Sequence, residues 1–130
     1  MLYTGCILKN NSIGTRISVM SRHTLNDGIT PHPKINEISY DEHLIVLAPP
    51  YNLIGDYYKR GLSWELFEIK YREYLKNKNV KIRVKDIGQR SLTEDLTILC
   101  IEEFPDNCHR RLLAEECQFY YPELKVIHLR

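Results

Sequence analysis

The chain alternates between short apolar runs and longer polar segments, a pattern typical of strands separated by helices and loops. Two runs are almost continuously apolar, LIVLA at 44–48 and DLTILC at 95–100. Such runs indicate strands that are buried on both faces, as in a parallel sheet covered by helices. A third run, RISVM at 16–20, is rich in β-branched residues and predicts another strand.

The remaining pattern completes an α/β arrangement. The segments 4–9 and 124–129 predict an edge strand and a last strand, and helices are predicted at about 51–59, 62–76 and 108–120. The segment 79–89 fits either an edge strand or a short helix. Because strand, helix and strand follow one another near the end of the chain, a parallel crossover is expected. We therefore predict one domain over 1–130, a small Rossmann-like α/β fold with a mostly parallel sheet flanked by helices.

The clearest helix signal lies at 62–76. Ser63 suits the N-cap position, and Gly61 ends the preceding helix. Trp64, Phe67 and Tyr71 then recur at helical spacing, which predicts an apolar face directed at the core.

Polar residues follow the predicted strands at one edge of the sheet, where parallel α/β folds bind ligands. Ser21 and Arg22 follow the 16–20 run, and they open a long polar connection over 21–43 of the kind that often serves as a binding loop. Tyr51 follows the 44–48 run and could stack on a ring. Cys100 ends the 95–100 run.

Reactive and charged side chains are concentrated in the next segment, where Glu102, Cys108, His109 and Arg110 follow Cys100 within ten residues. Asp106 or Asn107 is expected to cap the helix, which would place Cys108 in its first turn. The helix dipole and the adjacent cations would then favour the Cys108 thiolate and lower its pKa. His109 could act as a general acid or base.

Two arginines in a first helical turn are unfavourable, since this turn prefers acids. Arg110 and Arg111 therefore suggest a site for phosphate, carboxylate or another anion. The alternative is that Glu102, Glu103 and Glu115 neutralise them. Cys100, Cys108 and His109 could also bind a metal, for which zinc is the natural choice, although their spacing fits no standard zinc motif. Otherwise Cys100 is a small core residue, as we expect for Cys6 and Cys117. This alternative fits Cys108 less well, because a thiol at an exposed helix start has little packing to do.

Bulk composition excludes several classes. Eighteen basic and 17 acidic residues give a net charge of +1, so the composition does not indicate a general nucleic-acid or membrane binder. A local basic patch could still bind nucleic acid. Apolar stretches are too short to cross a bilayer, and the first residues do not match a signal peptide. Four cysteines are too few for a disulfide scaffold, so a cytoplasmic setting with free thiols is expected.

The chain resembles the family "domain of unknown function 488". TRISVMSR near the start, LAPPYNLIGDYYKRGLSWELFEIKYREYL in the middle and LTILCIEEFPDNCHRRLLAE near the end carry the likeness. The last stretch contains the pattern C-x-E-x5-C-H-R, which falls on Cys100, Glu102, Cys108, His109 and Arg110. The likeness thins over 23–43 and 76–95. It implies a small α/β fold and a shared site, and it supplies no reaction.

The expected function is an enzyme acting on an anionic substrate, such as a nucleotide or a nucleic-acid fragment, through thiol or metal chemistry as a hydrolase or transferase. Cys100, Glu102, Cys108 and His109 would be catalytic. The expected binding residues are Ser21, Arg22, Tyr51 and Arg110. A non-catalytic module that binds a nucleotide or small anion is one alternative, and a purely structural role for the cluster is another. No glycine-rich phosphate loop, G-x-S-x-G or H-E-x-x-H motif is present.

Overall fold

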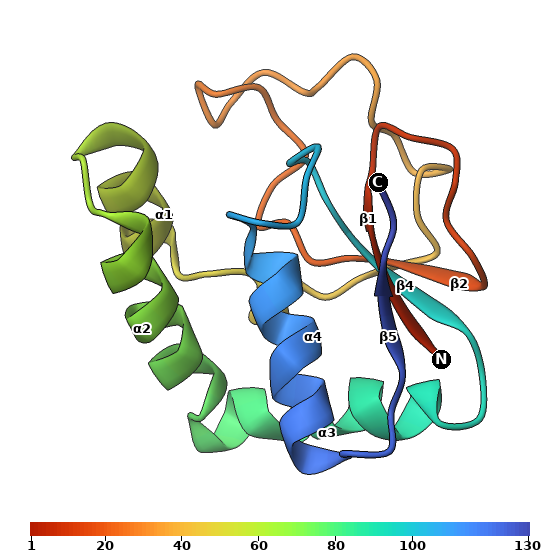
Figure 1. The fold of residues 1–130 in the computed structure, drawn as a ribbon. Coiled ribbons are helices and arrows are strands. Elements are labelled where there is room, and N and C mark those ends of the chain that lie inside the picture. The colour runs from red at the N-terminus through yellow and green to blue at the C-terminus, as the bar shows by residue number, and fades with distance from the viewer.

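A computed structural model describes residues 1–130 as a five-stranded, all-parallel sheet with helices around it (Figure 1). The strands are β1 (Leu2–Cys6), β2 (Thr15–Ser18), β3 (Glu42–His43), β4 (Leu96–Cys100) and β5 (Val126–His128). The helices are α1 (Tyr51–Lys59), α2 (Trp64–Leu75), α3 (Lys78–Ser91) and α4 (His109–Tyr120), with a 3-10 turn, η1, at Ile45–Leu47. The predicted α/β class is confirmed. None of the helices is both long and apolar enough to cross a lipid bilayer.

The strand order is β3-β2-β4-β1-β5, so β4 lies at the centre of the sheet and all five of its residues are buried. In a Rossmann fold β1 lies between β2 and β4, whereas here β4 lies between β2 and β1. The chain therefore shares with that fold a parallel sheet flanked by helices, but it differs in the order of the strands. The prediction that the N-terminal strand is an edge was wrong, because β1 pairs with both β4 and β5. The residues at 4–6 are small and only weakly apolar, so the sequence did not indicate that this part of β1 is buried.

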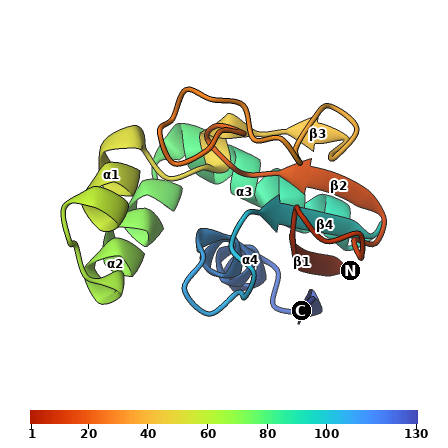
Figure 2. The same ribbon diagram turned by 90° about the horizontal axis from the view of Figure 1, so that it is seen from above.

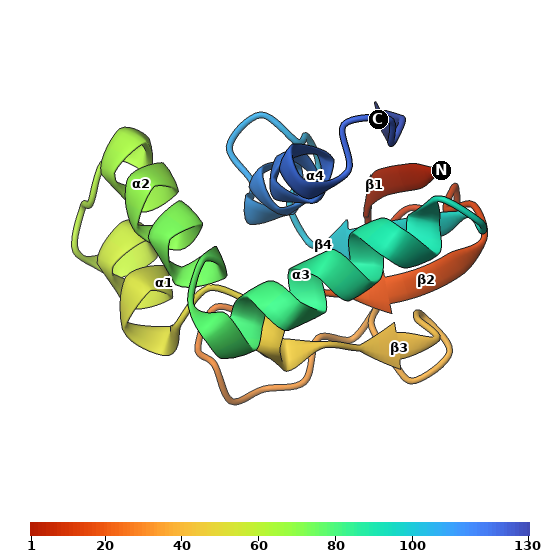
Figure 3. The same ribbon diagram turned by 90° about the horizontal axis from the view of Figure 1, so that it is seen from below.

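Helices cover both faces of the sheet. α4 packs against β1 and β4, and α1 and α2 lie side by side beyond α4 (Figures 1 and 2). Figure 3 shows α3 along the opposite face, where Arg90 pairs with Glu42 of β3 at 2.7 Å. The main core forms between these layers.

The helix boundaries follow local signals. The Ser63 side chain accepts a hydrogen bond from the Leu66 N–H at 3.2 Å, which confirms the predicted N-cap of α2. Gly61 adopts φ +76°, a conformation that favours glycine, just after α1. The undecided segment 79–89 is part of α3, which buries Val80, Val84 and Ile87 at helical spacing.

The predicted strand at 44–48 was wrong. The pairing with β2 ends at Glu42–His43, and the chain then turns through η1 towards Pro49 and Pro50. Ile45 is 58% exposed, so the apolar run does not face a core on both sides. A run of five apolar residues cannot by itself distinguish a buried strand from a short turn that buries only part of its length.

Candidate functional site

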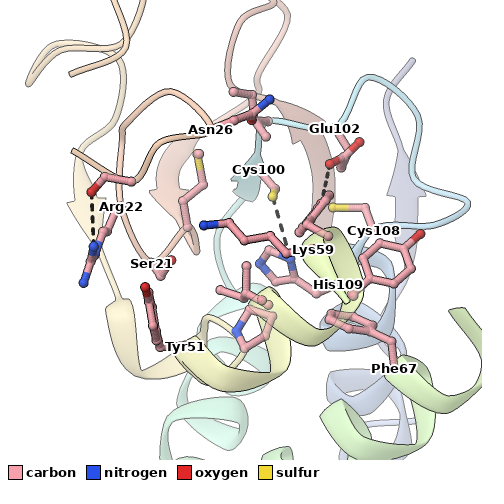
Figure 4. Close-up of a pocket in the computed structure, with 18 of the residues that line it drawn as sticks. Ser21, Arg22, Asn26, Tyr51, Lys59, Phe67, Cys100, Glu102, Cys108 and His109 are labelled. Carbon is pink, nitrogen blue, oxygen red and sulfur yellow. Dashed lines mark hydrogen bonds between the residues drawn. The ribbon is translucent and has the colours of Figure 1, made fainter. Parts of the chain in front are cut away.

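A cavity of about 600 Å³ opens at the carboxyl ends of β2 and β4, between these strand ends and helices α1 and α2 (Figure 4). Residues from the 20–28 connection form another wall. Seven of the eight predicted site residues line the cavity: Ser21, Arg22, Tyr51, Cys100, Glu102, Cys108 and His109. The expected convergence of segments far apart in sequence is therefore observed. Their chemical roles remain predictions.

The imidazole of His109 lies beside Cys100. Its Nδ1 is 3.7 Å from the Cys100 Sγ, and its Nε2 is 2.8 Å from the backbone oxygen of Val19. A carbonyl oxygen can only accept a hydrogen bond, so Nε2 carries the hydrogen when the ring is neutral. The lone pair of Nδ1 is then directed at the sulfur, which is the arrangement of a thiol and its proton acceptor.

The two cysteines of the site differ in acidity, and the expected assignment was wrong. A hydrogen bond from Cys108, the nearby backbone N–H groups and the charge of Arg110 lower the pKa of Cys100, although burial opposes them. Burial and the neighbouring Cys100 sulfur raise the pKa of Cys108 well above its ordinary value, although His109 favours its thiolate. Cys100 is therefore the more acidic thiol of the pair.

The start of α4 explains why Cys108 differs from expectation. Neither Asp106 nor Asn107 caps the helix, because Cys108 itself occupies the N-cap with extended backbone angles and makes no capping hydrogen bond through its side chain. Its side chain is directed inward and is only 2% exposed. Desolvation at that depth outweighs the helix dipole.

Arg110 is not placed to bind a ligand in the cavity, so its predicted binding role is wrong in this structure. Its side chain is fully buried and does not line the cavity. Nη1 donates to the backbone oxygen of Glu102 at 2.6 Å and to the Cys108 Sγ at 3.3 Å, and Nη2 reaches the backbone oxygen of Glu103. Arg110 thus holds the turn between β4 and α4. Arg111 pairs with Glu115 at 2.6 Å, as the alternative reading expected.

Cationic and aromatic side chains make up the wall of the cavity opposite the sulfur atoms. The Arg22 guanidinium lies over the Tyr51 ring, 5.1 Å from its centroid, and donates to the backbone oxygen of Gly28 at 3.1 Å. No carboxylate pairs with Arg22. A flat aromatic face beside a free positive charge suits a ligand that combines a ring with an anionic group.

Lys59, which the sequence reasoning missed, adds a second cation. Its side chain extends into the cavity from the last turn of α1 (Figure 4) and forms no ion pair or hydrogen bond. Arg60 also lines the cavity, but it is paired with Asp56 at 2.6 Å. A lysine in the last turn of a helix is common for electrostatic reasons alone, so the sequence offered no signal that Lys59 faces a cavity.

The two acidic residues of the lining are already engaged. Glu102 accepts a hydrogen bond from the Tyr58 hydroxyl. Asp27 accepts hydrogen bonds from the backbone and hydroxyl of Thr30 within its own loop. These donors are neutral, so both carboxylates keep their negative charge, but neither forms an ion pair with Arg22 or Lys59. The lining therefore carries charges of both signs, with its two cations unpaired.

The same sulfur atoms and imidazole could also hold a metal ion. One ligand atom each from Cys100, Cys108 and His109 lies within 4.8 Å of the other two. The Val19 carbonyl orients the His109 ring and leaves Nδ1 free, as outer hydrogen bonds do for metal-bound histidines. Two thiolates and one imidazole are a ligand set that zinc accepts, with a fourth position left open.

Comparison with known proteins gives one family match. A family model described as "DUF488-N3a: Active DUF488-N3 subclade" matches residues 8–119. No curated protein and no solved structure gives a significant match to the chain. The matched range includes all eight residues that the sequence singled out.

Proposed function

Since this chain belongs to the DUF488 family, and matches the subclade that its model describes as active, we propose that it is an enzyme with Cys100 as its nucleophile. The substrate is an anionic molecule that carries a ring, of which a nucleotide or a nucleic-acid fragment is the best example. The reaction is a group transfer to water or to another acceptor. The four free cysteines suit a reducing compartment such as the cytoplasm.

One observation carries this proposal. The Cys100 sulfur lies in a cavity of about 600 Å³, with a proton acceptor at 3.7 Å and unpaired cations on the facing wall. A buried structural cysteine has no need of such surroundings, whereas a nucleophile needs a base, access and a place for the substrate.

The chemistry follows from these positions. His109 Nδ1 accepts the Cys100 proton, and the sulfur forms a bond to the electrophilic atom of the substrate. The bond from that atom to the leaving group breaks, and the leaving group takes the proton back from His109. Water or an acceptor then attacks the covalent intermediate, His109 takes its proton, and the bond to sulfur breaks to release the Cys100 thiolate. Arg22 and Lys59 hold the anionic part of the substrate, and Tyr51 packs against its ring.

The first test measures thiol reactivity. Iodoacetamide is expected to label Cys100 in wild-type protein faster than the other three cysteines, and nucleotides are expected to slow this labelling. Cys100→Ser should remove the fast label, whereas Cys117→Ser, which changes a thiol on the far half of α4, should not. Uniformly slow labelling of all four cysteines would contradict the proposal.

The second test separates an enzyme from a binding module and from a structural domain. Lys59→Ala and Arg22→Ala should weaken nucleotide protection, with Lys78→Ala, an exposed residue at the start of α3, as the control. A module without chemistry would bind nucleotide equally well after Cys100→Ser and would turn over no substrate. A purely structural cluster would show no protection, and its cysteine substitutions would only lower the melting temperature.

A metal-dependent hydrolase is the second candidate, favoured by the close approach of the Cys100, Cys108 and His109 ligand atoms. In that case the ion would supply Lewis-acid chemistry at its open position. Stoichiometric zinc in protein purified without chelators, and activity lost on chelation, would favour this candidate over the free thiolate.

A further inference from the structure

We propose that Cys108 is a resolving cysteine, which closes a disulfide with Cys100 when a hydroperoxide oxidises the site. The inference rests on the proposed role of Cys100 as the reactive thiol, and it assigns Cys108 a role that the proposed reaction does not use. The resulting bond is a reversible modification that switches the site off.

The geometry favours this pair over any other. The two sulfur atoms lie within 4.8 Å of each other. Forming a bond of about 2.05 Å requires them to approach further. Cys100 ends β4 and Cys108 precedes α4, and the 101–107 connection between them contains no helix or strand. Rotation of both side chains and a small movement of this connection can close the gap.

The other two thiols are held apart from this pair. Cys6 lies beside Cys100 in the register of β1 and β4, but its Sγ donates to the Ile101 backbone oxygen at 3.3 Å. Strand pairing on both sides fixes the backbone of β1. Cys117 is fully buried in α4, and its Sγ contacts the Val84 carbonyl of α3. Neither residue joins the group formed by Cys100, Cys108 and His109.

The surroundings of Cys108 fit a resolving thiol. The Arg110 guanidinium lies 3.3 Å from the Cys108 Sγ, where its positive charge offsets part of the cost that burial imposes on the attacking thiolate. A small peroxide can reach Cys100 through the same cavity that would admit the substrate.

The chemistry balances in two steps. The Cys100 thiolate attacks one oxygen of the hydroperoxide, so that an S–O bond forms and the O–O bond breaks. The departing oxygen takes a proton and leaves as water or an alcohol. Cys108 sulfur then attacks the Cys100 sulfur of the sulfenic acid, the S–O bond breaks, and the hydroxide leaves as water with the Cys108 proton. A dithiol reductant reverses the modification, and the disulfide prevents further oxidation to sulfinic acid.

The test treats reduced protein with one equivalent of hydrogen peroxide and measures its intact mass. Wild type is expected to lose two hydrogen atoms, and peptide mapping should identify a Cys100–Cys108 link. Dithiothreitol should then restore iodoacetamide labelling of Cys100. In Cys108→Ser, dimedone should trap a sulfenic acid on Cys100, and excess peroxide should cause a loss of labelling that dithiothreitol does not recover. Cys6→Ser serves as the control and should behave as wild type.

The possible results separate this inference from the proposed function. A Cys6–Cys100 link, or recoverable oxidation in Cys108→Ser equal to that of wild type, would overturn the resolving role. If Cys100 is labelled in reduced protein but no Cys100–Cys108 link forms, only this inference fails. If Cys100 is not labelled at all, the proposed function fails with it. The wild-type mapping decides the question even if Cys108→Ser does not fold.

Discussion

The Nε2 of His109 lies 2.8 Å from the backbone oxygen of Val19, so the first residue of α4 is joined to the residue that follows β2. This contact orients the ring in two ways. It fixes which nitrogen carries the hydrogen, and it directs the other nitrogen at Cys100. The ring also meets Tyr71 edge-on, with centroids 5.5 Å apart, which limits its rotation. A helix start and two strand ends therefore position one proton acceptor.

Replacing His109 should affect both stability and reactivity. His109→Phe keeps a ring of similar shape but removes the hydrogen bond to Val19, which should cost about 1–2 kcal/mol of unfolding free energy. It should also slow iodoacetamide labelling of Cys100, because the proton acceptor is lost. Urea denaturation and labelling rates measure the two effects. His32→Phe, in the 21–43 connection and outside the cavity, is the control. Unchanged labelling in His109→Phe would show that the imidazole does not act on the thiol.

Arg110 should prove to be a stabilising residue. Arg110→Met retains much of the buried volume but leaves the Glu102 and Glu103 carbonyl oxygens without their donor. We expect a loss of about 2–4 kcal/mol in the free energy of unfolding, measured by urea denaturation. Its neighbour provides a matched control. Arg111→Met removes partly exposed ion pairs with Glu115 and Glu68 and an exposed hydrogen bond to the Asp106 backbone oxygen, and this should cost about 1 kcal/mol. Equal losses in the two variants would contradict this account of Arg110.

Much of the fold was predictable because its signals are local. Ser63 and Gly61 mark helix ends through their own backbone and side-chain properties, so α1 and α2 were predicted closely. The strand at β4 was predictable because a buried central strand needs apolar residues on both faces. The prediction of a strand at 44–48 was wrong because a strand also needs a neighbouring segment to pair with. Only Glu42–His43 pairs with β2.

The sequence predicted where the site lies, but it did not predict the pKa values of its cysteines or the role of Arg110. Strand ends converge in any parallel sheet, so the meeting of Cys100 with Ser21 and Arg22 followed from topology. Successive helical residues diverge by about 100°, so two adjacent arginines face different directions, and the sequence does not say that Arg110 is the buried one. The relative acidity of Cys100 and Cys108 depends on which donors reach each sulfur. Those donors come from contacts that only the folded chain creates.

Zinc should protect Cys100 from labelling. Ligands around a tetrahedral zinc ion lie roughly 3.5 Å apart, and the Cys100 Sγ is 3.7 Å from the His109 Nδ1. Adding one equivalent of Zn²⁺ to metal-free protein should therefore slow iodoacetamide labelling of Cys100, and EDTA should restore the original rate. Cys108→Ser should weaken the protection, whereas Cys117→Ser should leave it intact. Labelling that is indifferent to Zn²⁺ would show that these atoms do not act together as ligands.

Stability should decrease at mildly acidic pH because of a histidine outside the sulfur cluster. The His23 Nε2 lies 2.7 Å from the Ser18 Oγ, and its ring stacks on Tyr40 and lies 4.3 Å from the ring of His43. Burial, with a contribution from the charge of His43, lowers the pKa of His23 from 6.5 to about 4. The folded protein thus binds this proton more weakly than the unfolded chain does.

The sign of the pH effect follows from this difference. The contribution of His23 to stability is fully present above pH 6.5, where neither state is protonated, and it is lost as the pH falls from 6.5 towards 4. The two pKa values alone would give about 3 kcal/mol, and the partial exposure of the ring reduces the expected loss to roughly 1–2 kcal/mol. Burial also lowers the pKa of His128, which acts in the same direction, so a comparison of variants is needed.

His23→Phe provides that comparison, because it keeps a ring against Tyr40 and removes the titrating group. Urea denaturation at several pH values between 4.5 and 7.5 should give a steeper loss of stability for wild type than for the variant. Parallel pH profiles would mean that His23 is protonated as easily in the folded protein as in the unfolded chain. Residues 24–28 of the same connection line the cavity. Protonation of His23 should therefore also reduce nucleotide protection of Cys100 in wild type before the protein unfolds, and should not do so in His23→Phe.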